Sequence, residues 1–267
     1  MASVLVSDVR EMLKEQVEYR GLLFQMVKRD LLVRYKQSVM GFAWAIFMPL
    51  INTAVFTIIF TRVAPIDTPV PYPLYAYCGL WAWNLFAASL RFSVGSLTGN
   101  PNLVTKVYFP REIFPFSAVA VSLVDFAVAS TVLIGLMVYF QVAPTRTIVL
   151  LPAVLLVHVV FTAGVGLLLS LGNLFYRDVK YIFDLVLTIW MFMTSVLYPL
   201  DAIGGRVALL VRLNPMTPII DGYRVALFGL PMRDPVGFGV AAFLAFAILA
   251  GSWLLFHRSE FQFAENI

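Results

Sequence analysis

Three ionisable side chains lie within long apolar stretches of this 267-residue sequence: Asp125, His158 and Asp184. Charged groups are costly in hydrocarbon, so such residues are the first candidates for proton relays or for buried polar contacts in a membrane protein. Asp125 and His158 fall near the middle of two successive stretches that run in opposite directions. We therefore predict a hydrogen bond between them, which either locks the two helices together or takes part in a proton relay.

Asp184 has a simpler interpretation. It follows Lys180 by four residues, which is the spacing of an ion pair on one face of a helix. The apolar stretches contain no longer series of Asp, Glu and His residues that could carry protons across several helices. This pattern argues against a pump driven by a proton gradient.

Aromatic side chains are the second group that could contact a substrate. They make up 15% of the chain and are not confined to the interfaces where Trp and Tyr usually collect. Their faces can stack on the apolar C–H faces of sugars and let them slide, or they can simply fill contacts between helices. The candidates for lining a substrate path are Trp44, Phe47, Tyr77, Trp81, Trp83, Phe86, Trp190 and Tyr198.

The sequence lacks the motifs of several enzyme classes. A P-loop requires the dipeptide Gly-Lys, which occurs nowhere, and the patterns H-E-x-x-H and G-x-S-x-G are also absent. Cys78 is the only cysteine, which excludes an intramolecular disulfide and a thiolate metal cluster. We expect no catalytic residue, no metal site and no cofactor in this chain, and therefore no hydrolysis by the chain alone.

Six apolar stretches must position these residues: 38–61, 72–90, 113–140, 148–175, 181–200 and 236–256. A helix needs about 20 apolar residues to cross a hydrocarbon core of about 30 Å, and each stretch is long enough. The chain is 61% hydrophobic and 13% charged, with a mean hydropathy of +0.87, which excludes an ordinary soluble domain. We predict an all-α polytopic membrane protein whose six-helix transmembrane domain covers residues 38–256.

The charges predict the orientation of the chain. With six spans, the segment 1–37 and the tail 257–267 share one side, and thirteen Lys and Arg residues lie there against six opposite. The excess of cytoplasmic Lys and Arg then places both termini in the cytoplasm. Apolar residues in segment 1–37 recur at the helical period, which predicts an amphipathic helix that lies on the inner leaflet or contacts a cytoplasmic partner. No cleavable secretory signal is expected in this segment.

Two loops have unusual compositions. In the cytoplasmic loop 91–112, prolines bound a segment of about two helical turns, too short to be stable alone, so it must dock on this chain's own helices or on another subunit. In the outer loop 201–235, the apolar segments 205–213 and 218–230 are too short to span the membrane. Such half-helices are expected to be re-entrant or interfacial, as at the mouth of a pore.

Several strings, collinear over most of the chain, resemble the membrane subunits of type 2 ABC exporters of bacterial surface polysaccharides, such as O-antigen, capsular polysaccharide or teichoic acid. They are residues 34–44 (RYKQSVMGFAW) with 48–50 (MPL), 102–112 (NLVTKVYFPRE), 176–180 (YRDVK), 197–199 (LYP), 214–218 (NPMTP) and 221–224 (DGYR). Each string is weak alone, but their shared order is specific. The resemblance implies a permease of the bacterial cytoplasmic (inner) membrane that exports a lipid-linked polysaccharide.

The resemblance also implies partners. The permease would be a homodimer bound to two copies of a separate cytoplasmic ABC ATPase, which would hold the ATP and Mg²⁺, and no nucleic acid is expected among its partners. The eight aromatic candidates would line the substrate path of the homodimer. Two alternatives remain: an ABC permease for a drug or an unconjugated lipid, and a proton-coupled secondary transporter that relies on Asp125, His158 and Asp184.

The resemblance assigns roles to residues of both loops. Contact with the ATPase would involve Asn100, Leu103, Lys106, Tyr108, Phe109, Arg111 and Glu112 in the first cytoplasmic loop, and Arg177, Asp178 and Lys180 in the second. The outer gate would contain Arg206, Arg212, Asn214, Pro215, Asp221, Tyr223 and Arg224.

Overall fold

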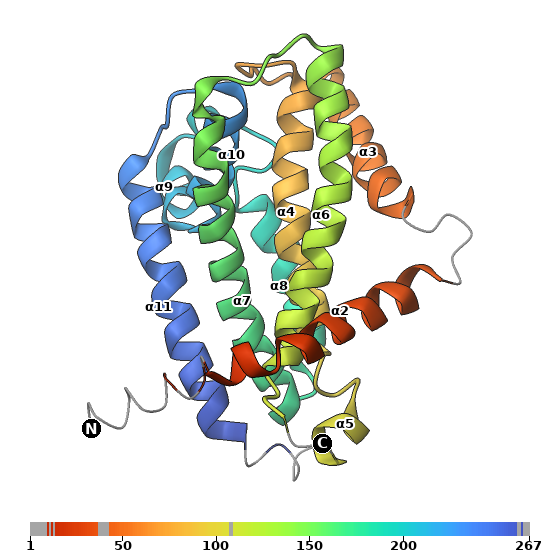
Figure 1. Ribbon diagram of the computed structural model, residues 1–267. Coiled ribbons are helices and arrows are strands. Elements are labelled where there is room, and N and C mark those ends of the chain that lie inside the picture. Colours follow the sequence, from red (N-terminus) through yellow and green to blue (C-terminus); the bar gives the residue numbers. More distant parts are fainter. Residues whose placement is uncertain are drawn as a thin grey trace.

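The computed structural model describes residues 14–36, 43–106 and 109–260, together with Arg10, Met12 and Phe263. Every regular element in these residues is helical. Long helices stand side by side and form the body of the molecule, while α2 (Arg20–Tyr35) lies across its lower end (Figure 1). Tyr108, which the sequence places in the cytoplasmic loop, lies outside the described residues.

Four segments are long and apolar enough to cross a membrane. They are Ile46–Val63, which comprises most of α3 (Ala43–Ile58) and a π-helical turn (Ile59–Val63), α6 (Ile113–Tyr139), Arg146–Phe175, which includes α7 (Leu151–Phe175), and α11 (Pro235–Ser259). They correspond to four of the six predicted stretches. The all-helical membrane class is thus confirmed, whereas the count of six spans stays a prediction.

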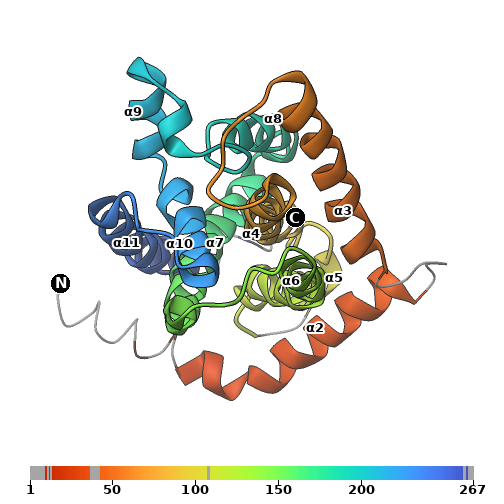
Figure 2. The same ribbon diagram turned by 90° about the horizontal axis from the view of Figure 1, so that it is seen from above.

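The helix α4 (Tyr72–Val94) occupies the middle of the bundle. Figure 2 shows it between α3, α6, α7 and α8 (Val179–Phe192). It has 23 residues, but its Tyr, Trp, Asn and Ser side chains make it less apolar than the four segments. Two of these side chains bond to the neighbouring helix α6: Tyr77 Oη donates to the carbonyl oxygen of Ala129, and Trp81 Nε1 donates to that of Phe126, both at 2.9 Å. Neighbouring helices, rather than apolarity, shield α4 from lipid.

The predicted stretch 181–200 is not one continuous helix. Helix α8 ends at Phe192, and the chain turns before a short 3₁₀ segment, Leu200–Ala202. The 14 residues of α8 span only about 21 Å, which is less than the thickness of a hydrocarbon core. Side chains from other segments explain why the helix ends here. Arg224 donates to the carbonyl oxygens of Ser195 and Val196. Asn214 donates to the carbonyl oxygen of Met193. Side chains therefore bond the carbonyls that a longer helix would have used.

The two short helices of the outer loop are present. Helix α9 (Gly205–Leu213) is largely exposed, whereas α10 (Met216–Phe228) is almost wholly buried against α4, α7 and α11. The observed bounds match the predicted segments closely for α9 and begin two residues earlier for α10. An apolar segment too short to cross the membrane was thus a sufficient sequence signal for both helices.

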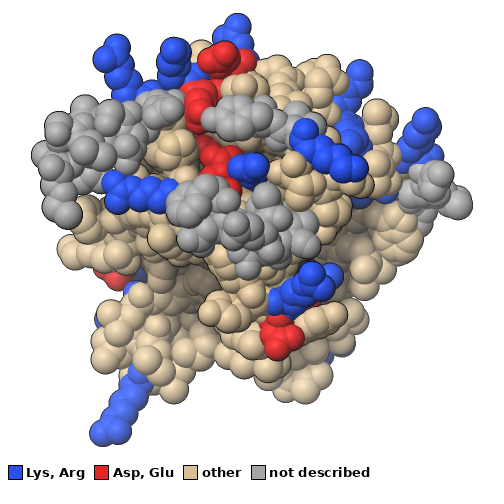
Figure 3. Space-filling view, turned by 90° about the horizontal axis from the view of Figure 1, so that it is seen from below, with Lys and Arg blue, Asp and Glu red and all other residues tan. Residues whose placement is uncertain are grey.

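A second apolar core ties the lower end together. Its buried side chains come from α2, from α5 (Pro101–Lys106), from the ends of the long helices and from Phe263; they are Met26, Leu97, Val104, Phe109, Ile113, Phe114, Leu167, Leu171, Leu174, Phe256 and Phe263. Many Lys and Arg side chains project from this end (Figure 3). On α2 itself, Phe24 and Val33 are exposed; its position at a membrane interface stays a prediction.

Replacing Gly79 by Ala tests the packing of α4 on the turn after α8. An added Cβ would lie 2.1 Å from the carbonyl oxygen of Val196 and 2.8 Å from Nη2 of Arg224. We expect a loss of about 1–3 kcal/mol in the free energy of unfolding, the usual range for overpacking. The measurement is the melting temperature of the detergent-purified protein.

Gly135→Ala is the matched control, because nothing lies within 4 Å of a Cβ added there in α6. It should melt with the unsubstituted protein or slightly above it. Equal melting temperatures for the two variants would contradict the close approach of α4 to the 193–199 turn.

Candidate functional site

A groove that contains both aromatic and charged side chains opens in the lower half of the bundle between α2, α3, α4 and α6. It encloses about 490 Å³ and is lined by the predicted residues Trp44, Trp81 and Asp125, and also by Arg34 and Arg91. Arg91 forms an exposed ion pair with Asp184, Nε to Oδ1 at 3.2 Å. The groove therefore combines aromatic rings with cations.

Asp125 is bound by the end of α2. Tyr35 Oη donates to its Oδ1 at 2.5 Å, and Arg34 forms an ion pair with its Oδ2. The Arg34 guanidinium also lies over the ring of Phe92, 3.8 Å from its centroid. Partial burial, with the hydrogen bond and negative charge of Asp125, raises the pKa of Tyr35 to about 12. The phenol thus stays protonated and keeps donating to the carboxylate at physiological pH.

His158 has a different partner. Its Nδ1 lies 3.0 Å from Tyr223 Oη, so the contact joins α7 to α10 inside the bundle. The predicted hydrogen bond between Asp125 and His158 is therefore wrong, since each side chain is bound elsewhere. The predicted pair of Asp184 with Lys180 is also wrong, because Asp184 faces Arg91 of α4. In both cases a residue on another helix lies closer than the expected partner.

The aromatic candidates divide into two groups. Tyr77, Trp81, Trp83 and Phe86 of α4 are buried, and Trp81 stacks on Phe126 with ring centroids 3.8 Å apart. Trp190 and Tyr198 are partly buried and donate hydrogen bonds to Asn214 and to the carbonyl oxygen of Phe192. Trp44 and Phe47 on α3 are exposed and in edge-to-face contact. The four rings of α4, together with Trp190 and Tyr198, therefore fill contacts between helices in this structure. Only the pair on α3 is exposed and accessible to a substrate.

Arg224 is the centre of the outer segment. Only 1% of it is exposed, and it donates from Nη1 to Ser195 and from Nη2 to Val196 at 2.8 and 2.7 Å. Its guanidinium lies 3.7 Å from the centroid of the Tyr75 ring. Two carbonyl oxygens and an aromatic face therefore contact this buried charge directly.

Asn214 connects α8 to the start of α10. Its Nδ2 donates to the carbonyl oxygen of Met193 and to Thr194 Oγ1, and its Oδ1 accepts from Trp190 Nε1 and from the backbone N–H of Met216. The other predicted gate residues are dispersed. Tyr223 is buried, Pro215 and Asp221 are intermediate, and Arg206 and Arg212 on α9 are exposed.

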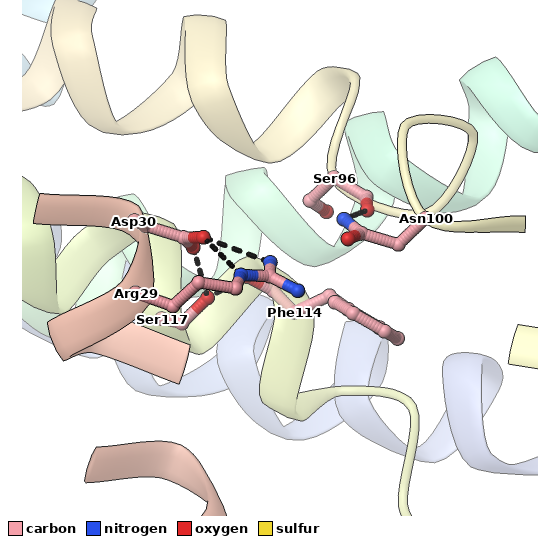
Figure 4. Close-up of polar contacts among 6 residues, drawn as sticks. All are labelled: Arg29, Asp30, Ser96, Asn100, Phe114 and Ser117. Atoms are coloured by element: carbon pink, nitrogen blue, oxygen red, sulfur yellow. Dashed lines mark hydrogen bonds and ion pairs between the residues drawn. The ribbon is translucent and has the colours of Figure 1, made fainter. Parts of the chain in front are cut away.

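The loop between α4 and α6, which the sequence predicts to be cytoplasmic, packs on the chain's own helices. Asn100 Nδ2 donates to the carbonyl oxygen of Ser96 at 2.9 Å, next to the contact of Asp30 on α2 with Ser117 on α6 (Figure 4). Arg111 donates from Nε to the carbonyl oxygen of Val104 and forms an ion pair with Glu260. The loop residues that follow α5 are thus part of the fold.

One face of this loop remains open. Pro101, Asn102, Thr105 and Lys106 are exposed, Leu103 is intermediate, and Phe109 and Glu112 are buried. Arg177, Asp178 and Lys180 of the second loop are exposed as well. Of the residues predicted to contact another subunit, Lys106 and the second loop are accessible, whereas Phe109 and Glu112 are not.

The sequence comparisons identify the family. Residues 21–228, from α2 to the end of α10, match the family described as ABC-2 type transporter. A protein of Myxococcus xanthus described as O-antigen export system permease protein RfbA is 32% identical over 260 residues, which cover 96% of this chain and 99% of that protein. This chain belongs to the ABC-2 type transporter family.

Two relatives from Klebsiella pneumoniae carry the same description. They are 28% and 29% identical over 245 and 248 residues, each covering 91% of this chain and 94% of the relative. In this ABC-2 transporter subunit, the family match includes the groove, the loop that contains α5, and helices α9 and α10, but not α11.

Sequence reasoning missed the role of α2 in this ABC-2 transporter subunit. Arg34 and Tyr35 were noted only as part of a resemblance, although they immediately precede the first apolar stretch. An arginine and a tyrosine directly before the first apolar stretch could have been recognised as candidate partners for Asp125, the acid in a later apolar stretch.

A double-mutant cycle tests the contact between α2 and α6. Arg34→Gln and Asp125→Asn should each cost about 1–3 kcal/mol of stability, because each leaves a partly buried polar group without its charged partner. The double variant should lose clearly less than the sum, since the partners interact directly. Thermal unfolding of the purified protein measures all three; strictly additive losses would contradict the ion pair.

Proposed function

We propose that this chain is the membrane subunit of an ATP-driven exporter that moves a lipid-linked cell-surface polysaccharide across the bacterial cytoplasmic membrane. The observation that carries the proposal is the nearly full-length match to a permease named for O-antigen export. The sequence contains no P-loop, so a separate ABC ATPase would bind ATP and Mg²⁺ and hydrolyse the nucleotide. The chain itself would act as a transport subunit.

In this proposal the chain crosses the membrane six times with both termini in the cytoplasm. The four apolar segments are joined by α4, which its neighbours shield from lipid, and by α8 with the turn that follows it. The lower end in Figure 1, with α2 and α5, is then cytoplasmic. The excess of Lys and Arg on that side supports this orientation.

The substrate path would lie between two copies of the chain. Helix α4 fills the middle of the single bundle, so a polysaccharide cannot pass along the axis of one copy (Figure 2). We place the path along the side that carries α3 and α8, where Trp44 and Phe47 are exposed and Trp190 is partly so. The groove beside it, with Arg34 and Arg91, would receive the phosphate end of the lipid carrier.

Coupling to the ATPase would use the exposed face of α5 and the second loop. When the bound ATPases close, they would press on Asn102, Thr105 and Lys106. Arg111 joins the backbone of α5 to the start of α6 and to Glu260 beyond α11, so a displacement of α5 would reach both long helices. At the outer end, parting of α8 from α10 would require the hydrogen bonds of Asn214 to break.

Deletion of the gene in its native host tests the proposed cargo. We expect the surface polysaccharide to disappear while its lipid-linked form accumulates in the cytoplasmic membrane, with export restored by the intact gene. The readout is immunoblotting of whole cells and of inverted membrane vesicles. Unchanged surface polysaccharide would contradict the proposal.

Unchanged surface polysaccharide would instead favour the alternative function, a permease for a drug or an unconjugated lipid. One observation is consistent with it: a cavity of about 660 Å³ between α4, α6 and α7 has an almost wholly apolar lining that includes Phe126, Leu133 and Met137.

Charge reversal at Lys106 tests the coupling surface. Lys106→Glu should reduce co-purification of the ATPase and export, because it reverses the charge at the exposed end of α5, where the ATPase would bind. Arg146→Glu is the matched control, as that residue is exposed at the opposite end of the bundle. Equal recovery of the ATPase with both variants would show that α5 is not the docking element.

Substitution of the α3 rings tests the substrate path. Trp44→Ala with Phe47→Ala should lower export several-fold without changing the melting temperature or ATPase binding, because both rings are exposed. Val55→Ala, an exposed apolar residue further along α3, is the control. Normal export by the ring variant would remove these rings from the path.

A further inference from the structure

We propose a divalent transition-metal site at the inner end of the bundle, formed by Glu15, Glu112 and His257. The three side chains offer two carboxylate oxygens and one imidazole nitrogen, and these atoms all lie within 4.8 Å of one another. The sequence predicted no metal here, because the ligands are about 100 or more residues apart along the chain and form no spacing motif. The proposal is independent of what the protein transports.

The three ligands come from three different elements. Glu15 lies in the helical segment 14–18 ahead of α2, Glu112 is the residue before the first turn of α6, and His257 is in the last turn of α11. Met12, close to Glu15, is buried, so this N-terminal segment is packed against the protein. A metal would therefore join the segment before α2 to the ends of two long helices.

Unpartnered buried atoms point to a missing ligand. Glu112 is fully buried; its Oε1 accepts from Trp253 Nε1 at 3.0 Å, but its Oε2 has no hydrogen-bond partner among the described residues. His257 Nδ1 is likewise buried and without a partner there. Buried polar atoms are normally satisfied, and one cation bound at this cluster would satisfy both residues.

The charge balance also favours a cation. The carboxylate of Glu260 lies close by, where Arg111 binds it through its backbone N–H and its guanidinium. Arg111 therefore compensates Glu260, and Glu15 has a contact of its own, whereas the buried Glu112 carboxylate accepts from Trp253 and forms no ion pair among the described residues. A buried carboxylate without a full counter-charge is costly, and a divalent ion at the cluster would remove that cost.

The donor set indicates the class of metal. Mixed imidazole and carboxylate ligands suit Zn²⁺ and related first-row ions, with distances of about 2.0–2.2 Å. Ligand atoms of a tetrahedral zinc ion lie about 3.3 Å apart, so rotations of these side chains could bring atoms now within 4.8 Å into place. Glu15 and His257 are only partly buried, which leaves water access to the fourth position.

The role follows from the connection to α2. That helix carries Arg34 and Tyr35, which hold Asp125 at the groove. A metal that fixes the segment before α2 would fix the start of this helix against α6 and α11. The site is thus a structural clip for the helix that closes the lower side of the groove.

Zinc binding to the tag-free, chelator-treated protein in detergent tests the proposal. We expect one zinc ion per chain by mass spectrometry of the metal content, a single-site calorimetric isotherm, and a zinc-dependent rise in melting temperature. His257→Gln and Glu15→Gln should each weaken binding at least about tenfold, because loss of even an outer-shell partner of a metal site has that effect. Both residues are partly exposed, so these variants should fold.

Glu18→Gln is the matched control: it removes an exposed carboxylate from the same helical segment and should bind zinc as the unsubstituted protein does. The proposal is overturned if the unsubstituted protein binds no zinc at micromolar concentration. It is also overturned if His257→Gln and Glu15→Gln bind as tightly as Glu18→Gln, since the metal would then lie elsewhere.

Discussion

At membrane depth a polar group has only protein to bond with, and the end of this molecule that contains α9 and α10 depends on that constraint. The buried Arg224 requires acceptors, and the chain supplies them by ending α8 early, so that the carbonyls of Ser195 and Val196 point at its guanidinium. Asn214 meets the same need for the neighbouring turn. Gly79 lets α4 approach this turn, because no side chain would fit. The turn, the buried helix α10 and the central helix α4 are thus held together at this point.

The inner half is organised by packing between elements that are short or marginal alone. Helix α2 has one fully buried apolar residue, Met26, and α5 has Val104. Both become ordered because the ends of α6, α7 and α11 complete a shared apolar core around them. The Asp125 contacts attach the far end of α2, and the proposed metal clip would attach its beginning. A force applied to α5 therefore acts on a connected structure, as ATP-driven transport by an ABC-2 permease would require.

Several features could be predicted because they depend on composition and length. The apolar stretches identified the membrane helices, and segments 205–213 and 218–230 were recognised as half-helices because neither could span a bilayer. The end of α8 could not be predicted, since the apolar stretch continues past Phe192 and the competing bonds come from Asn214 and Arg224, which lie in other segments. The partner of Asp125 was missed for the same reason: helix order suggested His158, whereas α2 reaches the site from the side.

By itself the sequence determined the membrane class, the family and the identity of the chemically active side chains, because hydropathy, motif order and residue type are local properties. Only the tertiary structure decided which of those side chains meet: Arg34 with Asp125, Arg91 with Asp184, and Glu15 with Glu112 and His257. It also decided that most of the candidate rings are buried while the α3 pair is exposed. Polar contacts between distant segments depend on how helices cross and on which atoms are left unsatisfied, and neither is encoded in any one stretch of the chain.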